Sequence, residues 1–286
     1  MMAKLHSLEA SRQFKAIIGC VLLILHVSVS ANEPLIVAHR GASGQAPENT
    51  LPAFKLAWEQ GADVVEGDFQ LTKDGHIVCV HDRDTKRVSG EKIIVKDSTL
   101  AELQRLDVGS FKGAEFKGTR IPTIAEVFEL VPEGKTIFIE LKSGKEIVPQ
   151  LLKDLKKSEL DNDQIVVICF DADVLLEISR KAPEIKLSWL VNFKKGKDGE
   201  IQPQVNTAFK ILKLIKADGI GTSKKFVDEE FIKRVHSLGY KHHVWTVNDL
   251  PTARNFQQWG TRSITTDFPA EIRKGLLVAK EQKVNQ

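Results

Sequence analysis

The chain has 286 residues, of which 42% are apolar and 28% are charged. This apolar fraction excludes wholesale disorder, and three cysteines are too few for a disulfide scaffold. The net charge of +3, from 41 basic and 38 acidic residues, gives no nucleic-acid signature, so no nucleic-acid partner is expected.

The amino-terminal residues 1–31 are predicted to be a secretory signal peptide. Basic residues precede an apolar run at 16–29, and small residues follow it. Val29 and Ala31 fit the −3 and −1 positions of a cleavage site, which places cleavage after Ala31. A membrane anchor is the alternative, but the run is shorter than the ~20 residues of a spanning helix and His26 interrupts it.

Cleavage would leave residues 32–286, with 38 basic and 37 acidic residues, because three basic residues and one acidic residue leave with the signal. An exported protein is therefore expected, periplasmic in a Gram-negative bacterium and secreted otherwise, with no stable membrane anchor. Cys79 and Cys169 lie in apolar runs and are expected to be buried free thiols.

The mature chain alternates between short apolar runs and segments typical of helices. The expected strands are 35–39, 63–72, 136–142, 165–171, 185–191, 218–223, 241–247 and 263–267. The expected helices run from Thr50 to near Gly61, then over 123–130, 145–157, 172–181, 205–216, 228–238 and 250–259, and finally from Pro269.

Two stretches interrupt this alternation. Residues 76–82 are expected to run back beside 63–72 as a hairpin strand, since Lys73-Asp74-Gly75 reads as a turn. Residues 83–120 are polar, with no clear helix beyond 98–106, so an insertion of about residues 73–120 is expected after the second strand. A loop rich in Lys and Gly is expected at 194–203.

Eight strand–helix units in about 250 residues predict an α/β fold, a closed (β/α)8 TIM barrel forming one domain. A doubly wound open sheet is the alternative that this pattern leaves.

Polar residues gather at the carboxyl ends of the expected strands, which is where barrel enzymes place their catalytic residues. They are His39-Arg40-Gly41, Glu66 and Asp68, His81-Asp82, Glu140 and Lys142, Trp245 to Asn248, and Asp267.

Three of these residues are carboxylates inside otherwise apolar strands. Glu66 and Asp68 are two apart and share one face of a strand, and Glu140 lies on the next expected barrel strand. Three carboxylates at one barrel mouth repel each other unless a cation lies between them. All-oxygen ligation favours Ca²⁺ or Mg²⁺ over zinc.

His39 and His81 each end an apolar run at the same mouth. A single histidine there is more often structural, but two of them beside a metal indicate general acid–base catalysis, because imidazole titrates near neutrality. Arg40 and Lys142 are candidate phosphate ligands, Arg40 through its planar fork and Lys142 as a point charge.

Over about residues 35–270, the sequence closely resembles the glycerophosphodiester phosphodiesterase family. The resemblance rests on HRGASGQAPENTLPAF, EGDFQLTKDGHIVCVHD, IPTIAEVFEL, IELK, VWTVN and ITTDFP, in that order. It implies a (β/α)8 barrel with a small insertion after the second strand. The implied activity is hydrolysis of glycerophosphodiesters, such as glycerophosphocholine or glycerophosphoethanolamine, to glycerol 3-phosphate and an alcohol.

The resemblance also assigns roles to this chain's own residues, and the sequence does not depart from the family at any of these positions. The general acid–base pair would be His39 and His81. The ligands of one divalent cation, Ca²⁺ or Mg²⁺, would be Glu66, Asp68 and Glu140. Substrate and phosphate would be held by Arg40, Glu48, Lys142 and Trp245, with Glu48 in direct contact or supporting the site.

Two rival functions remain open on the sequence. One is a related barrel phospholipase acting on lysophospholipids, for which Phe111 and Phe116 among basic residues are a weak membrane-facing surface. The other is an exported phosphodiester-binding protein without catalysis, which is disfavoured because both histidines and all three carboxylates are present. The sequence leaves open the oligomeric state, the headgroup preference and whether water or a glycerol hydroxyl is the nucleophile.

Overall fold

The barrel strands lie in the order expected of a closed parallel sheet. The computed structural model describes residues 33–284, so the expected signal peptide and its cleavage site lie outside the described residues. Within the described part, eight parallel strands form a ring: β1 (Leu35–His39), β2 (Val64–Leu71), β4 (Thr136–Leu141), β5 (Ile165–Cys169), β6 (Lys186–Val191), β9 (Gly219–Ser223), β10 (Lys241–Trp245) and β11 (Ser263–Thr266). Because β1 pairs with both β2 and β11, the ring closes and the predicted barrel is confirmed.

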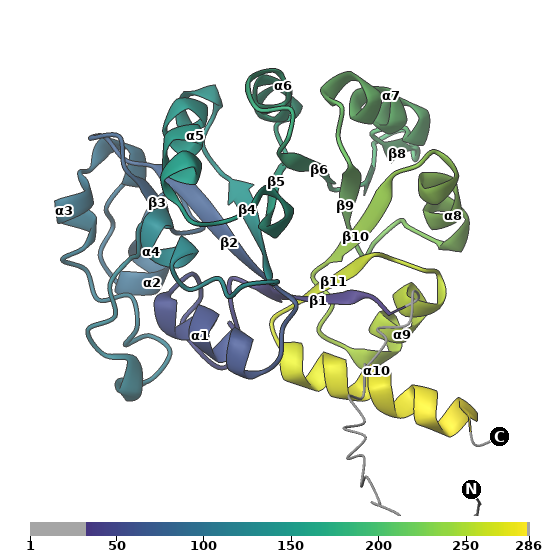
Figure 1. The fold of residues 1–286 in the computed structure, drawn as a ribbon, viewed down its shortest axis with the longest axis horizontal. Coiled ribbons are helices and arrows are strands. Elements are labelled where there is room, and N and C mark those ends of the chain that lie inside the picture. The colour runs from purple at the N-terminus through teal and green to yellow at the C-terminus, as the bar shows by residue number, and fades with distance from the viewer. Residues whose placement is uncertain (1–32, 285–286) are drawn as a thin grey trace, which may run out of the picture. The chain divides into compact units, whose positions relative to one another are not determined.

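The helices surround this ring, as Figure 1 shows. They are α1 (Leu51–Glu59), α4 (Ile124–Phe128), α5 (Val148–Lys157), α6 (Ala172–Lys181), α7 (Val205–Ile215), α8 (Glu229–Ser237), α9 (Leu250–Gln258) and α10 (Pro269–Val284). Several begin at capping side chains: Thr50 caps α1, Thr123 forms a capping box with Glu126 at α4, and Asp228 caps α8. The 3₁₀ turns Lys145–Ile147 and Asn162–Gln164 lead into α5 and β5.

Side chains alternate between the two faces of each strand, and this alternation makes two cores. Outward-facing residues pack under the helices in the larger cluster, which includes Ile36, Val65 and Ile139. Inward-facing residues fill the lower part of the barrel: Val37, Val64, Phe138, Ile168 and Leu190. The next inward-facing positions on β1, β2 and β4, two residues further along each strand, are His39, Glu66 and Glu140, so the apolar filling ends where the site residues begin.

Residues 83–120 pass outside the ring, at the left of Figure 1 beyond β2. The strand that precedes them, β3 (Ile77–Cys79), pairs antiparallel with β2. They contain α2 (Lys86–Ser89), α3 (Leu100–Leu103) and two 3₁₀ turns, Val95–Asp97 and Ala114–Phe116. The predicted helix over 98–106 is therefore shorter than expected, and α2 was not predicted.

This 83–120 segment has a small hydrophobic core of its own, shared with β3. Its buried members are Val78, Val80, Val88, Val95, Leu103, Leu106, Val108 and Ile121. Burial of several aliphatic side chains at about 1.5–3 kcal/mol each explains why a polar stretch still has a defined structure. The loop expected at 194–203 also contains a short hairpin, β7 (Lys194–Lys195) with β8 (Ile201–Gln202).

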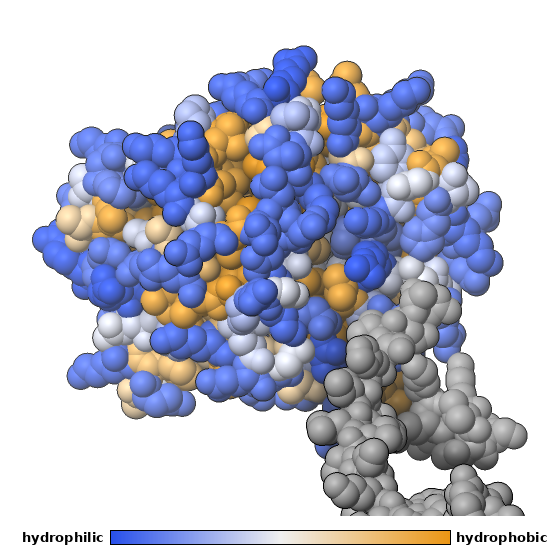
Figure 2. Space-filling model, in the orientation of Figure 1, coloured by the Kyte–Doolittle hydropathy of each residue, from blue (hydrophilic) through white to orange (hydrophobic). Residues whose placement is uncertain are grey.

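One face of the described unit can be judged from a space-filling view. Figure 2 shows one face on which hydrophilic residues predominate and hydrophobic residues show between them. Within residues 33–284, no helix combines the length and the apolar character that crossing a membrane requires. Cys79 and Cys169 are buried free thiols, as predicted.

Candidate active site

The loop after β1 brings backbone and side chains to the barrel mouth in an unusual conformation. Arg40 and Gly41 both have positive φ, at 57° and 79°. A Cβ on Gly41 would lie 2.6 Å from the carbonyl carbon of Ala53, so only glycine fits this close approach to α1. The Arg40 backbone N–H thereby donates to Glu66 Oε2 at 2.9 Å, which ties the loop to β2.

Three carboxylates meet at the carboxyl ends of β2 and β4. Asp68 is the register partner of Glu140, and Glu66 is the register partner of His39 on β1. One oxygen from each of Glu66, Asp68 and Glu140 lies within 4.8 Å of the others, and all three residues are buried. The strand register therefore places them together without help from any loop.

Two positively charged side chains lie against these carboxylates. Arg40 Nε is 3.1 Å from Asp68 Oδ2, and Lys142 Nζ is 3.0 Å from Asp68 Oδ1 and also hydrogen-bonded to Glu140 Oε1. The Arg40 and Lys142 side chains each keep 18% of their surface exposed. Each cation is thus fixed by the carboxylates while remaining open to a ligand at the mouth.

Burial and the neighbouring charges give the three carboxyl groups of the triad different pKa values. Burial would raise the pKa of Asp68, but the Lys142 and Arg40 charges lower it to about 2. Burial and the Asp68 charge raise the pKa of Glu66 to about 8. Burial, followed by the same Asp68 charge, also raises the pKa of Glu140. In the absence of a cation, Glu66 therefore holds a proton at neutral pH that a cation would displace.

This donor set fits a hard divalent cation. Glu66 Oε1 is buried and has no hydrogen-bond partner within the described residues, an arrangement that is unfavourable unless a ligand satisfies it. The three candidate ligands are all carboxylate oxygens, which suit Ca²⁺ or Mg²⁺. Glu66, Asp68 and Glu140 can therefore hold one such ion.

Each of the two mouth histidines is held by a carboxylate through Nδ1. His39 Nδ1 lies 2.7 Å from Asp267 Oδ1, and His81 Nδ1 lies 2.7 Å from Asp82 Oδ1. Against the effect of burial, hydrogen bonding to His39 lowers the pKa of Asp267 to about 2, and Arg87 and His81 lower the pKa of Asp82. Ionised carboxylates only accept, so both Nδ1 atoms donate and both Nε2 atoms stay available for proton transfer.

Asp267 is itself held by neighbours on two sides. Its Oδ1 accepts from Ser43 Oγ at 3.0 Å, and its Oδ2 accepts from Asn248 Nδ2 at 2.6 Å. Burial would lower the pKa of His39, but the hydrogen bond to Asp267 and the Glu66 charge raise it. His39 is therefore a base strengthened by its carboxylate, in a fixed orientation.

Asn49 fixes the buried Asp68. Its Nδ2 donates to Asp68 Oδ2 at 2.8 Å, and its Oδ1 accepts from the Asp68 backbone N–H at 3.0 Å. Asn49 has a φ of 58°, a region that Asn tolerates better than most residues. The motif around Glu48 and Asn49 thus supports the carboxylate as well as starting α1.

Glu48 joins the mouth to the 83–120 segment. Its Oε1 accepts from Arg40 Nη1 at 3.0 Å, and both of its oxygens accept from Arg87, at 2.6 and 2.8 Å. Arg87 also donates to Asp82. Glu48 therefore supports Arg40, and its own contacts within the described residues are with two arginines.

Trp245 forms an aromatic part of the mouth. It ends β10, and its ring meets that of Phe170, which follows β5, edge to face with centroids 5.6 Å apart. Phe170 is nearly half exposed. Strands β5 and β10 are not neighbours in the sheet, so this contact spans the barrel opening.

All nine residues singled out from the sequence lie at this end of the strands. The contacts of Arg40, Glu66, Asp68, Glu140, Lys142, Glu48 and His39 form one connected network. His81 joins through its electrostatic effect on Asp68. Sequence reasoning assigned no role to Asn49, Arg87 or Asn248, and it noted Asp267 only as a polar strand end.

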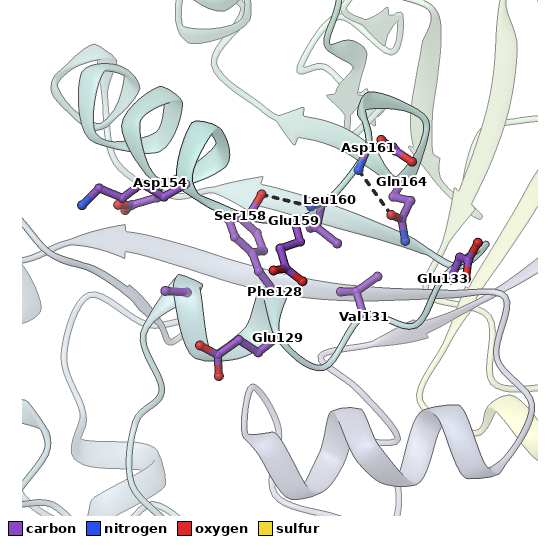
Figure 3. A pocket seen from close by; sticks show the side chains of 12 residues that line it. Phe128, Glu129, Val131, Glu133, Asp154, Ser158, Glu159, Leu160, Asp161 and Gln164 are labelled. Carbon is purple, nitrogen blue, oxygen red and sulfur yellow. Dashed lines mark hydrogen bonds between the residues drawn. The ribbon is translucent and has the colours of Figure 1, made fainter.

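A hollow away from the barrel mouth is shown in Figure 3. It has a volume of about 740 Å³ and lies between α4, α5 and the turn before β5. Its lining includes Phe128, Glu129, Asp154 and Asp161. The segments that line it precede β4 and β5, so this groove is at the amino ends of the strands, away from the triad.

The fold and the site together define a barrel enzyme of the phosphodiesterase class. Residues 39–271 match the model of the glycerophosphoryl diester phosphodiesterase family. The chain belongs to that family, as its sequence motifs predicted.

Named relatives agree with this assignment. A glycerophosphodiester phosphodiesterase of Caldanaerobacter subterraneus is 34% identical over 250 residues, covering 84% of this chain and 98% of the relative. One from Bacillus subtilis is 29% identical over 268 residues, covering 86% and 89%.

Solved structures show the same architecture. A phosphodiesterase of Oleispira antarctica, in complex with the product sn-glycerol-3-phosphate, is 29% identical with a TM-score of 0.77, covering 85% of this chain and 96% of that one. A glycerophosphodiester phosphodiesterase of Thermotoga maritima is 27% identical with a TM-score of 0.69, covering 85% and 98%.

Proposed function

We propose that the protein hydrolyses glycerophosphodiesters, such as glycerophosphocholine and glycerophosphoethanolamine, to glycerol 3-phosphate and an alcohol. The observation that carries this proposal is the pairing of two carboxylate-held histidines with a triad able to bind a cation, at one barrel mouth. Family membership supports the reaction, and the product bound to the Oleispira antarctica relative supports the substrate class.

The phosphate would be held on the positive side of the mouth. Arg40 and Lys142 are oriented by Asp68 and Glu48, so their remaining donors can meet the phosphate oxygens without reorganisation. A divalent cation on Glu66, Asp68 and Glu140 would supply further neutralisation of the phosphate charge. Trp245 would line the apolar side, where the glycerol or the leaving alcohol packs.

The two histidines would divide the proton transfers. One imidazole Nε2 takes the proton of the nucleophile while the other gives a proton to the leaving alcohol oxygen, and the P–O bond to that alcohol breaks. Asp267 and Asp82 keep the two rings in the orientation and tautomer that this exchange requires. The oxygen of the nucleophile forms the new bond to phosphorus as the bond to the alcohol breaks. The nucleophile is water, or the neighbouring glycerol hydroxyl, which would give a cyclic phosphate that water then opens to glycerol 3-phosphate.

The direct test is release of glycerol 3-phosphate from glycerophosphocholine by the purified protein. Release that a chelator abolishes and added Ca²⁺ or Mg²⁺ restores is the expected result. His39→Ala and His81→Ala, made separately, should each lower kcat by about 10²–10⁴-fold. Near-wild-type turnover in either variant would remove that residue from the mechanism.

The same assay separates the rival functions. Faster turnover of lysophosphatidylcholine than of glycerophosphocholine would identify a phospholipase, and binding without turnover would identify a binding protein. We also propose that the mature protein acts after export, on the ground of the sequence of residues 1–31. Fractionation of expressing cells, with amino-terminal sequencing, tests export and the cut after Ala31.

A further inference from the structure

One side chain of the 83–120 segment reaches the catalytic mouth. Arg87, on the short helix α2, uses all three of its guanidinium nitrogens. Nη1 and Nη2 donate to the two oxygens of Glu48 at 2.6 and 2.8 Å, and Nε donates to Asp82 Oδ2 at 2.6 Å. This is a bidentate pair and a third charged hydrogen bond on one planar group, an arrangement that Arg alone among the side chains can make.

Each carboxylate that Arg87 holds has a second partner in the site. Glu48 Oε1 accepts from Arg40 Nη1 at 3.0 Å, while Asp82 Oδ1 accepts from His81 Nδ1 at 2.7 Å. Arg87 is therefore the point where the support of Arg40 and the support of His81 meet. The two carboxylates come from different loops, Glu48 from the loop after β1 and Asp82 from the loop after β3, only five positions before Arg87 on α2.

Glu48, Asp82 and Arg87 differ in how far they are buried, and this shows which of them depends on the hydrogen bonds between them. Glu48 keeps 15% of its side-chain surface and Asp82 keeps 35%, whereas Arg87 keeps 45%. Burial would raise the pKa of Glu48, but Arg87 first and then Arg40 lower it. A partly buried carboxylate needs these partners, and an exposed guanidinium at its edge can be removed or replaced from solvent.

We propose that Arg87 is a positioning residue for the phosphodiesterase reaction, which sets the orientation of Arg40 through Glu48 and of His81 through Asp82. This proposal rests on the proposed function. Through Glu48 it governs a phosphate-binding side chain, and through Asp82 it governs a proton-transfer side chain. Loss of Arg87 should therefore act on KM and on kcat together, although Arg87 itself touches neither the phosphate nor the reacting atoms.

The experiment compares Arg87→Ala, Arg87→Lys and Arg120→Ala with the wild type on glycerophosphocholine. Arg120 is the matched control, since it belongs to the same segment, has a 55% exposed side chain, and pairs with Glu126 at the start of α4. Arg87→Ala should lower kcat/KM by about 10–100-fold, comparable to the loss found when residues that orient metal ligands are replaced. Arg87→Lys should keep part of the activity, because an ammonium cannot bond both carboxylates as a fork does.

Chemical rescue distinguishes positioning from a general loss of structure. Millimolar guanidinium ion should enter the exposed space in Arg87→Ala and restore part of kcat/KM, while the same concentration of sodium chloride should not. Arg120→Ala should stay within about threefold of wild type, as expected for an exposed ion pair. Arg87→Ala activity within threefold of wild type, or an activity loss that matches the loss of folded protein, would overturn the proposal.

A second measurement does not depend on the reaction. In a crystal structure of Arg87→Ala, the Glu48 and Asp82 carboxylates should have moved away from Arg40 and His81. Carboxylates unmoved in that structure would also overturn the proposal. If the wild-type protein releases no glycerol 3-phosphate, the proposed function fails, and the crystal structure still decides whether Arg87 sets these two side chains.

Discussion

Glu66 has to lose a proton before it can bind a divalent cation. With a pKa of about 8, it is about nine-tenths protonated at pH 7, so close to one proton should leave for each cation bound. The proton competes at every pH below that pKa. The apparent affinity should rise about tenfold from pH 6 to pH 7 and about fivefold from pH 7 to pH 8, and then level off.

Isothermal titration of the chelator-treated protein with Ca²⁺ and with Mg²⁺ measures both quantities. Titrations at pH 7 in two buffers of different ionisation enthalpy give the number of protons released. A count above one would have Glu140 as its second source, because burial raises its pKa too. The control is Glu66→Gln, which keeps the shape of the side chain; it should bind more weakly and with a flatter pH dependence.

Two results would refute this reasoning. An affinity that changes by less than about twofold from pH 6 to pH 8 would show that Glu66 is already ionised in the cation-free protein. Proton release that is unchanged in Glu66→Gln would place the titrating group elsewhere.

Three further predictions concern Asp267 and the β1 loop. Asp267→Asn should lower kcat by about 10²-fold or more on glycerophosphocholine, because the amide no longer fixes the His39 tautomer; equal turnover of the two proteins would contradict this. Acid unfolding followed by circular dichroism should show a smaller loss of stability in Asp267→Asn than in wild type. The lowered pKa of Asp267 stabilises the fold by about 2 kcal/mol above pH 4, and this is lost as the pH falls towards 2. Gly41→Ala should reduce the free energy of unfolding by at least about 2 kcal/mol, from the positive φ and the contact with Ala53, and a denaturation midpoint equal to wild type would argue against the close approach.

Much of the barrel could be predicted from the sequence because its signals are local. The strand expected at 35–39 coincides with β1, because an apolar run that stops just before a glycine marks it. The helix expected at 172–181 coincides with α6, because the N-cap Asp171 marks its start. Strand alternation also allows only one of the neighbouring residues His242 and His243, both on β10, to face the barrel interior. His243 alone lies against the inward-facing Phe138.

The missed features depend on contacts between distant segments. Helix α2 has only four residues, too few to show a helical period, and its position is set by Val88 in the small core of the 83–120 segment. The role of Asp267 was missed because its partner His39 is 228 positions away and meets it only when β11 pairs with β1. The residues at the strand ends could be predicted from the sequence, whereas the side chains that orient those residues could not.

The pairing of β1 with β11 joins the first and last strands of the barrel, from Leu35 with Ser263 to Ala38 with Thr266. His39 and Asp267 extend past this seam and meet at its end. During synthesis or refolding, the histidine therefore acquires its carboxylate only when the final strand docks. A chain cut short before β11 has every other group of the mouth but an unoriented His39, so full activity should be the last property that the folding protein gains.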